Sequence, residues 1–366
     1  MTIKNYLKFK KMKSKLLSTN STTKASLFGN MVQKTFYILL LGIWGCNNVP
    51  NDEIVITKFP ETVDLTSSII STDPVLLYPE SMFIFENQLF VFQSKKDTLF
   101  DVFRLSDFKH TNKMGTKGGG PNEFIKPMGK TIQLTDRGFS ILDYPFVKMI
   151  EVKDNGKLET IETIKAFKTL PVNGFSRIND SLFCSYAFCA TGKTGDYEYQ
   201  MVNRYTKSEK LFSPYPNLSD VSYEGDQRCQ IYVKSRAVHP DGRFFVSFYS
   251  YFKFFRIYYY TGEIYKEVRV KVAPYESSNL DDWEKRMFYY TNPCATDKYI
   301  YVMCYNSNSG DSYPEIQVWD WNGNPIIVYH LDKQIFSYTI SETDKKLYAT
   351  TLENEDKIYI YNLKHL

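Results

Sequence analysis

Short runs of alternating apolar and polar residues recur along this chain, separated by turn residues. Each copy of the recurring unit has an alternating strand, a loop, a second strand that ends in aromatic residues, a glycine turn and a third strand. Clear copies begin at Phe139, Phe244 and Tyr299, and weaker copies begin near residues 89, 182 and 347. The spacing of about 45 residues is typical of a four-stranded propeller blade. The pattern therefore predicts an all-β fold, a six-bladed β-propeller of four-stranded antiparallel blades.

Turn residues inside the copies agree with this prediction. Asn155-Gly156 and Asn322-Gly323 supply the positive φ angles that tight hairpin turns require, and Pro240-Asp241-Gly242 precedes the copy that begins at Phe244. Phenylalanine and tyrosine, which favour strands, number 27 and 29. These features indicate antiparallel hairpins throughout the chain.

The two ends of the repeat region predict how the ring closes. The last copy ends at Leu366 after three strands, whereas the strand-like run Ile54-Val55-Ile56-Thr57 lies upstream of the first full copy. We expect this N-terminal strand to complete the last blade, because closure removes unpaired sheet edges. Residues 53–366 are then one domain.

The N-terminal segment, residues 1–45, has the pattern of an export signal. An apolar run over residues 35–45 follows Lys34 and is shorter than the about 20 residues that span a bilayer. Ile43-Trp44-Gly45-Cys46 resembles a lipobox, in which the cysteine becomes lipidated, and residues 46–52 are predicted to be a polar tether. Met31 would start a signal of ordinary length and is the alternative start.

The lipobox resemblance implies a location. Cys46 would carry a diacylglyceryl group, and two acyl chains anchor a protein stably in a membrane. Asn47 follows this cysteine, which by resemblance to bacterial sorting signals favours the outer membrane. The expected location is the bacterial cell envelope, on the periplasmic side or facing the surface, with the lipid anchor as the only membrane contact. The competing interpretation is a free cysteine after a chance apolar run.

Net charge gives no support for nucleic acid as a partner. The chain has a formal charge of +4, but residues 1–45 contain eight lysines and no other charged residue. Without them, 37 basic side chains face 41 acidic ones, a balance of about −4. The domain therefore lacks the basic excess that nucleic-acid binding requires.

A glycine-rich segment between the first two copies resembles a known motif. Residues 114–127 look like the G-x-x-G-x-G-P-x-x-F-x-x-P segment between blades of NHL-type propellers, with Asn122 where that family usually has glycine. The matching positions are Gly115, Gly118, Gly120, Pro121, Phe124 and Pro127. Residues 52–366 as a whole resemble the TolB-like six-bladed β-propeller lipoproteins of bacterial envelopes. We interpret the segment as structural, because a nucleotide loop would need a following helix.

Strand alternation predicts which face binds. In four antiparallel strands the first and third turns share one face, and the second turn and the crossing to the next blade share the other. The second face collects the long segments, among them residues 191–197, 213–230, 275–290 and 306–314. Loops on a rigid scaffold commonly carry binding residues. The candidate contacts on this face are Tyr144, Phe146, Tyr223, Arg228, Tyr249, Tyr251, Trp283 and Tyr313.

Catalytic and metal-binding motifs are not evident, and the sequence predicts neither a metal nor a cofactor. The four histidines have no metal-ligand spacing, and no G-x-S-x-G elbow occurs. Residues 279–286 place acidic residues before basic ones, which predicts a short helix near the channel mouth. Three functions stay open: a non-catalytic binding or scaffold module for an envelope protein or glycan, a propeller enzyme such as a glycan lyase or hydrolase, and a small-ligand sensor.

Overall fold

The computed structural model describes residues 53–165, 174–187, 195–273, 280–308, 312–354 and 356–364. The predicted signal segment and the whole predicted tether, including the lipidation site Cys46, lie outside these ranges. Residues 51–366 form a compact unit of their own. Within the described residues, no helix combines the length and apolarity needed to cross a membrane.

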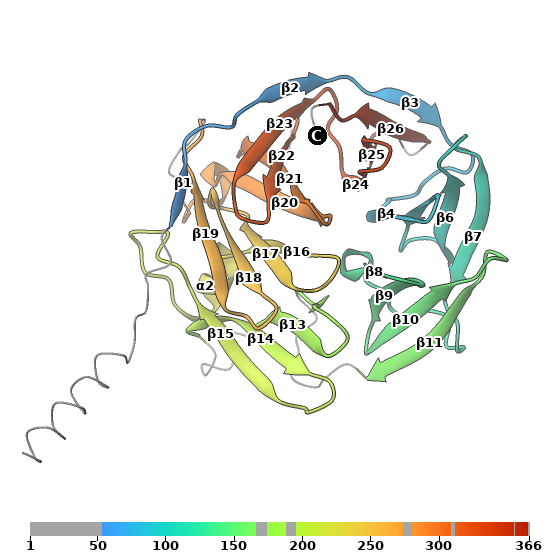
Figure 1. Cartoon of the computed structure of the whole chain (residues 1–366), viewed down its shortest axis with the longest axis horizontal. Helices are drawn as coiled ribbons and strands as arrows, with labels where there is room; N and C mark the ends of the chain where they lie inside the picture. Colours follow the sequence, from blue (N-terminus) through green and yellow to red (C-terminus); the bar gives the residue numbers. More distant parts are fainter. Residues whose placement is uncertain are drawn as a thin grey trace, which may run out of the picture. The chain divides into compact units, whose positions relative to one another are not determined.

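Six sheets surround a common centre, as the repeat predicts (Figure 1). Blades 1 to 3 are four-stranded and antiparallel. Blade 1 comprises β4 (Ser81–Phe85), β5 (Gln88–Phe92), β6 (Thr98–Arg104) and β7 (His110–Thr116). Blade 2 comprises β8 (Gln133–Thr135), β9 (Gly138–Asp143), β10 (Phe146–Val152) and β11 (Leu158–Lys165). Blade 3 comprises β12 (Ser176–Arg177), β13 (Leu182–Tyr186), β14 (Tyr197–Asn203) and β15 (Glu209–Pro214).

Blades 4 to 6 also take strands from the N-terminal segment. Blade 4 comprises β16 (Lys234–Val238), β17 (Phe244–Tyr249), β18 (Phe254–Tyr259) and β19 (Ile264–Val270). Blade 5 comprises β20 (Phe288–Ala295), β21 (Tyr299–Ser307), β22 (Glu315–Asp320) and β23 (Pro325–Leu331). Blade 6 has β24 (Ser337–Ser341), β25 (Lys346–Thr350) and β26 (Lys357–Asn362). Each predicted copy thus begins at the second strand of a blade.

An N-terminal strand completes the last blade as predicted, but this strand is β3 (Ser68–Ser71) and not the run at residues 54–57. Ile54–Ile56 (β1) pairs in parallel with β19, and Thr62–Leu65 (β2) pairs in parallel with β23, so blades 4 and 5 are five-stranded. Ser68–Ser71 (β3) pairs antiparallel with β26 and completes blade 6. Blades 4 and 5 already have four strands of their own, and the sequence repeat therefore gave no sign that their outer edges take a fifth.

The predicted hairpin turns are confirmed. Gly156, Gly242 and Gly323 have φ angles of 71°, 73° and 83°, which glycine adopts without strain. Each lies in the first or third turn of its blade. The long connections consequently leave from the other end of the strands.

The glycine-rich segment folds back against the end of β7 through its own hydrogen bonds. The Phe124 amide donates to the Thr116 carbonyl over 2.9 Å, and the Gly118 amide donates to the Phe124 carbonyl over 3.0 Å. The Phe124 ring is buried against Phe100. At Gly115 (φ 73°) a side chain would contact both of these rings.

Backbone amides of this segment donate hydrogen bonds to carboxylates of the same chain. Glu123 accepts from the Gly120 amide over 2.8 Å, and Asp143 accepts from the amides of Ile125 and Lys126 over 2.8 and 2.7 Å. Asp143 is buried and is also 3.1 Å from the Lys148 ammonium. Pro127 lies opposite Asp143 in a β-bridge, and Pro121 is the second residue of the turn that the Glu123 amide closes by donating to the Gly120 carbonyl. The contacts of this segment are with the chain's own residues, which agrees with its interpretation as a structural connection between blades.

The N-terminal strands contribute to the core unequally, which gives a matched test. Leu65 on β2 is 5% exposed and packs among residues of blades 5 and 6, whereas Ile69 on β3 is 51% exposed. We expect Leu65→Ala to lower the free energy of unfolding by about 2–5 kcal/mol, because it leaves a cavity. Ile69→Ala should change it by less than about 0.5 kcal/mol. Denaturant titration of both variants measures this, and equal losses would contradict the described packing.

Candidate functional site

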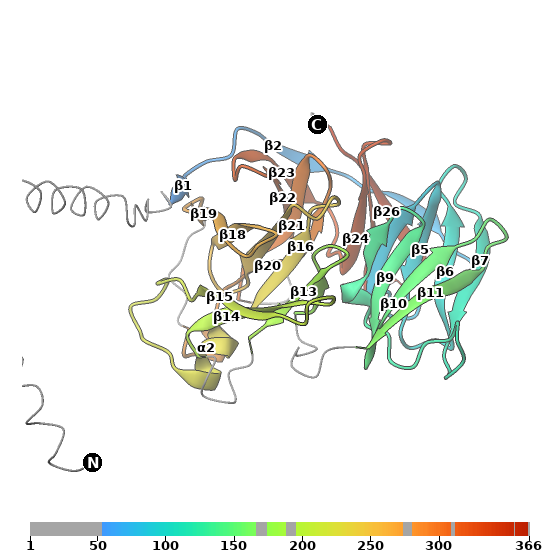
Figure 2. The ribbon, with the colours of Figure 1, turned by 60° about the horizontal axis from the view of Figure 1, so that its bottom comes forward.

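One rim of the propeller carries the second turn of every blade and the crossings between blades (Figure 2). The antiparallel order of the strands puts these connections at the same end. We call them the loop rim. Of the sixteen exposed large apolar residues in the described part of the chain, nine lie on it. They are Val75, Leu77, Ile125, Tyr144, Tyr197, Val221, Val233, Tyr313 and Leu352.

The opposite rim has fewer such residues. Of the sixteen, Tyr205 and Tyr260 lie on its third turns, Tyr259 ends β18 beside the same turn as Tyr260, and the other four lie on strands. Exposed apolar residues that gather on one face of a soluble domain are typical of an interaction surface. The loop rim is therefore the candidate site.

Two of the predicted contacts are exposed on the loop rim. Tyr144, 45% exposed, is in the second turn of blade 2, and Tyr313, 63% exposed, is in the second turn of blade 5. The Lys126 ammonium lies 5.9 Å from the centre of the Tyr144 ring. Phe146, by contrast, begins β10 and is half-buried. Tyr144 and Tyr313 are thus available to a partner.

Two other predicted residues hold the crossing from blade 3 to blade 4 in place. Tyr223 is buried, and its hydroxyl donates to Asp281 over 3.1 Å. Arg228, on the unpredicted helix α2 (Gly225–Ile231), donates through Nε to the Tyr223 carbonyl over 2.8 Å. Both side chains therefore bind the chain itself and position the crossing.

The crossing from blade 4 to blade 5 contains the predicted short helix. Trp283 begins this 3-10 helix, η4 (Trp283–Lys285), which is capped by Asp282 accepting from the Glu284 amide. The Trp283 side chain lies outside the described part of the structure. Nearby, Tyr251 is half-buried beneath the Arg286 guanidinium, which lies 4.8 Å from its ring centre.

Tyr249 has a different place from the one we expected. Its side chain is 0% exposed, because it ends β17 beneath α2 and packs against Phe254 and Tyr232. Its hydroxyl lies 2.7 Å from each oxygen of the Glu198 carboxylate. A partner on the surface cannot contact it, so Tyr249 belongs to the interior beneath the rim.

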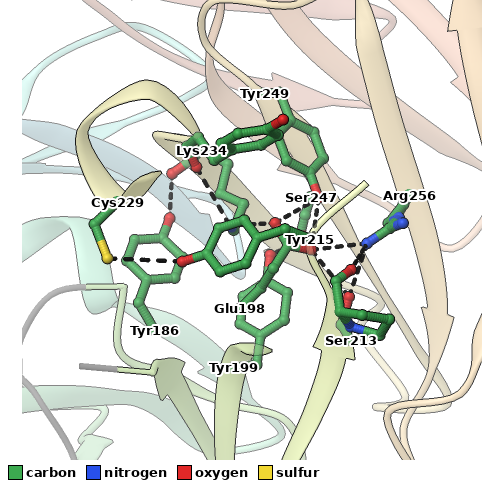
Figure 3. A network of polar contacts seen from close by, with 12 residues as sticks. Tyr186, Glu198, Tyr199, Ser213, Tyr215, Cys229, Lys234, Ser247, Tyr249 and Arg256 are labelled. Carbon is green, nitrogen blue, oxygen red and sulfur yellow. Dashed lines mark hydrogen bonds and ion pairs between the residues drawn. The ribbon is translucent and has the colours of Figure 1, made fainter. Parts of the chain in front are cut away.

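Glu198 is the centre of a buried ion-pair network (Figure 3). It lies on β14 and accepts from the Lys234 ammonium over 2.6 Å and from the Arg256 guanidinium over 2.9 Å. The Ser213 hydroxyl donates to it over 2.9 Å. Arg256 also pairs with Glu267 over 2.7 Å. Because β14 belongs to blade 3 and both cations belong to blade 4, the network joins these two blades.

Tyrosine rings surround the Lys234 ammonium. It lies 5.1 Å from the ring centres of Tyr199 and Tyr215, 5.2 Å from Tyr249 and 5.4 Å from Tyr186. Aromatic faces attract cations most strongly where water is excluded. Burial lowers the pKa of Lys234, and the Glu198 carboxylate opposes this shift.

The tyrosines of the network keep their protons at neutral pH. Burial raises the pKa of Tyr249 well above its usual value, and the Glu198 charge raises it further. Burial likewise raises the pKa of Tyr186 to about 12. Protonated hydroxyls donate hydrogen bonds and are poor bases or nucleophiles. The tyrosine hydroxyls therefore act as hydrogen-bond donors at the seam between blades 3 and 4.

Cysteines take two roles. Cys184, on β13, and Cys304, on β21, are free and buried in strands, and burial raises the pKa of both thiols. Cys229, on α2, is disulfide-bonded. Its sulfur lies 3.6 Å from the Tyr215 hydroxyl, next to the Glu198 network (Figure 3). The described residues include no group of three or more His, Cys, Asp or Glu side chains placed to hold a metal ion.

The closed ring, its alternating turns and its loop rim define the protein as a six-bladed β-propeller with one face suited to binding. The sequence model of the TolB-like six-bladed propellers matches residues 58–343, well over half of the chain. The chain therefore belongs to the TolB-like propeller family. No curated protein matches it in sequence.

Matches among solved structures have low sequence identity. A member of the DUF4221 family from Bacteroides vulgatus is 13% identical, with a TM-score of 0.57, over 81% of this chain and 97% of that chain. The β-propeller domain of Cps50 (Swd1) from Myceliophteria thermophila is 12% identical, with a TM-score of 0.42, over 82% of this chain and 100% of that chain. At such identities the likeness concerns the fold alone.

The Glu198 network predicts that removal of one tyrosine hydroxyl destabilises the fold. Tyr249→Phe removes a donor from a buried carboxylate and should lower the free energy of unfolding by about 1–3 kcal/mol. Tyr259→Phe removes an exposed hydroxyl from the neighbouring strand and should have almost no effect. Denaturant titration compares the two variants. A Tyr249→Phe protein as stable as the Tyr259→Phe protein would show that the contact does not stabilise the fold.

Proposed function

We propose that this protein is a non-catalytic binding module of the bacterial cell envelope, which recognises a protein or glycan partner through the loop rim. The observation that carries the proposal is the gathering of nine exposed apolar residues on the second turns and crossings. Tyr144, Tyr197 and Tyr313 are among them, and tyrosine is enriched in recognition surfaces. A rigid ring of blades lets such residues be presented without refolding.

Two features support the envelope as the location. The lipobox-like residues 43–46 would anchor the chain through Cys46, and Asn47 favours the outer membrane. The disulfide at Cys229 supports export, because disulfides persist in oxidising compartments. Membership of the TolB-like family, whose propellers are associated with the bacterial envelope, agrees with this location.

A partner capture with matched variants tests the proposal. The full chain would be used to capture partners from detergent-solubilised envelopes of its source bacterium, and eluates would be analysed for proteins and glycans. One variant replaces Tyr144, Tyr197 and Tyr313 on the loop rim by alanine, and the control replaces Tyr205, Tyr259 and Tyr260 on the opposite rim. All six tyrosines are exposed, so both variants should fold.

We expect the loop-rim variant to recover at least about tenfold less of the partner, because truncated interface aromatics cost about 2 kcal/mol or more. The control variant should recover as much as the unaltered protein. Loss of the partner in the control alone, or equal recovery by both variants, would contradict the loop rim as the binding face.

A further inference from the structure

Charge is divided unevenly around the loop rim. We define the basic sector as residues 93–97, 117–132 and 144–145, which are the second turns of blades 1 and 2 and the crossing between them. In this sector four exposed lysines stand against the single exposed carboxylate of Asp97. The lysines are Lys95, Lys117, Lys126 and Lys130. Lys96 and Glu123 are partly buried and bound within the chain.

The basic sector is one connected surface. The Lys117 amide donates to the Asp97 carbonyl over 3.0 Å, which joins the crossing to the turn of blade 1. The Tyr144 amide donates to the Lys126 carbonyl over 3.1 Å, which joins it to the turn of blade 2. Ile125 and Tyr144 are its exposed apolar residues. The sector therefore combines exposed lysines with two exposed apolar residues, and the Lys126 ammonium lies 5.9 Å from the centre of the Tyr144 ring.

The connections of blades 3 to 5 have the opposite charge. We define the acidic sector as the described residues 195–197, 215–233, 250–253, 271–273, 280–287, 308 and 312–314. Its exposed carboxylates are those of Asp196, Asp220, Glu224, Asp281 and Glu284, against the exposed lysines 271 and 285. The partly buried Arg228 guanidinium lies 3.6 Å from the Asp196 carboxylate. Lys285 pairs with Asp282 over 2.9 Å. Tyr197, Val221, Val233 and Tyr313 are its exposed apolar residues.

The two sectors occupy different parts of the ring, with blades 1 and 2 on the right of Figure 1 and blades 4 and 5 on the left. One surface with a positive and a negative sector, each with apolar residues, is complementary to itself. A two-fold axis in the plane of the rim, midway between the sectors, places each basic sector on the acidic sector of the other copy. The dimer then has two equivalent contacts, and in each the basic sector of one copy faces the acidic sector of the other. The exposed apolar residues of the two sectors lie in the same contacts.

We infer that the loop rim binds a second copy of this chain, face to face, through the pairing of the basic sector with the acidic sector. The inference rests on the proposed function, since it uses the same rim, and it names one occupant of that rim. The chain itself supplies the chemistry of the partner, because exposed carboxylates outnumber exposed lysines in the acidic sector and exposed lysines outnumber exposed carboxylates in the basic sector.

A charge-swap experiment tests this pairing. The first variant, Lys95→Glu with Lys126→Glu, makes the basic sector acidic, and the second, Glu224→Lys with Glu284→Lys, makes the acidic sector basic. Full chains with two different affinity tags are mixed in excess detergent at low salt, and capture through one tag measures the recovery of the other. The control, Lys109→Glu with Lys157→Glu, makes the same charge change on exposed residues of the opposite rim.

We expect the unaltered and control chains to capture themselves, and each sector variant alone to lose at least about tenfold in recovery. A mixture of the first and second variants should regain capture, because both of its contacts again join opposite charges. Capture should also fall as salt is raised. Shared misfolding or micelle sharing would not produce recovery in the mixture alone.

Two results would overturn the inference. Unaltered chains that do not capture each other would show that no second copy binds, and a mixture that stays apart would show that the sectors do not pair. Capture of a different envelope partner that depends on Tyr144, Tyr197 and Tyr313 would then leave the proposed function intact. Loss of both kinds of capture would remove both conclusions.

Discussion

Pairing of β3 with β26 is the contact on which the architecture depends, because it joins the N-terminal segment to the last blade and closes the ring. Backbone pairing at this point removes a sheet edge that would otherwise be exposed. The same segment adds β1 and β2 to the outer edges of blades 4 and 5, so it spans three consecutive blades. The loop rim exists as one surface only because the closed ring fixes all six blades.

Beneath that rim, the Glu198 network fixes the seam between blades 3 and 4. Removing one member of a buried ion pair costs about 3–5 kcal/mol, because the remaining charge is left without compensation. Here Glu198 pairs with Lys234, and Arg256 pairs with both Glu198 and Glu267. Around Lys234 the buried tyrosines exclude water, and α2 with the crossing that contains it lies over them. The buried polar groups thus hold the blades whose connections carry the exposed residues of the loop rim.

Sequence periodicity predicted the blades and the turns well, because alternation and Asn-Gly pairs act locally. It could not predict β1 and β2 as added strands, since outer-edge pairing leaves no repeat in the sequence. Tyr249 was assigned to the binding face because it borders a second turn and tyrosine is common in recognition surfaces, whereas its burial depends on α2 in the preceding crossing. Glu198 was missed, although a glutamate between Tyr197 and Tyr199 in an alternating strand was a signal.

The central claim is that the loop rim is the binding face, and site-specific photo-crosslinking in living cells tests it most directly. A photoreactive phenylalanine analogue would replace Tyr144 or Tyr313 on the loop rim, and Tyr205 or Tyr260 on the opposite rim. All four positions are exposed, so each variant should keep the fold. The account predicts defined crosslinked adducts from the two loop-rim positions and none from the other two. Adducts that form only from Tyr205 or Tyr260 would contradict it.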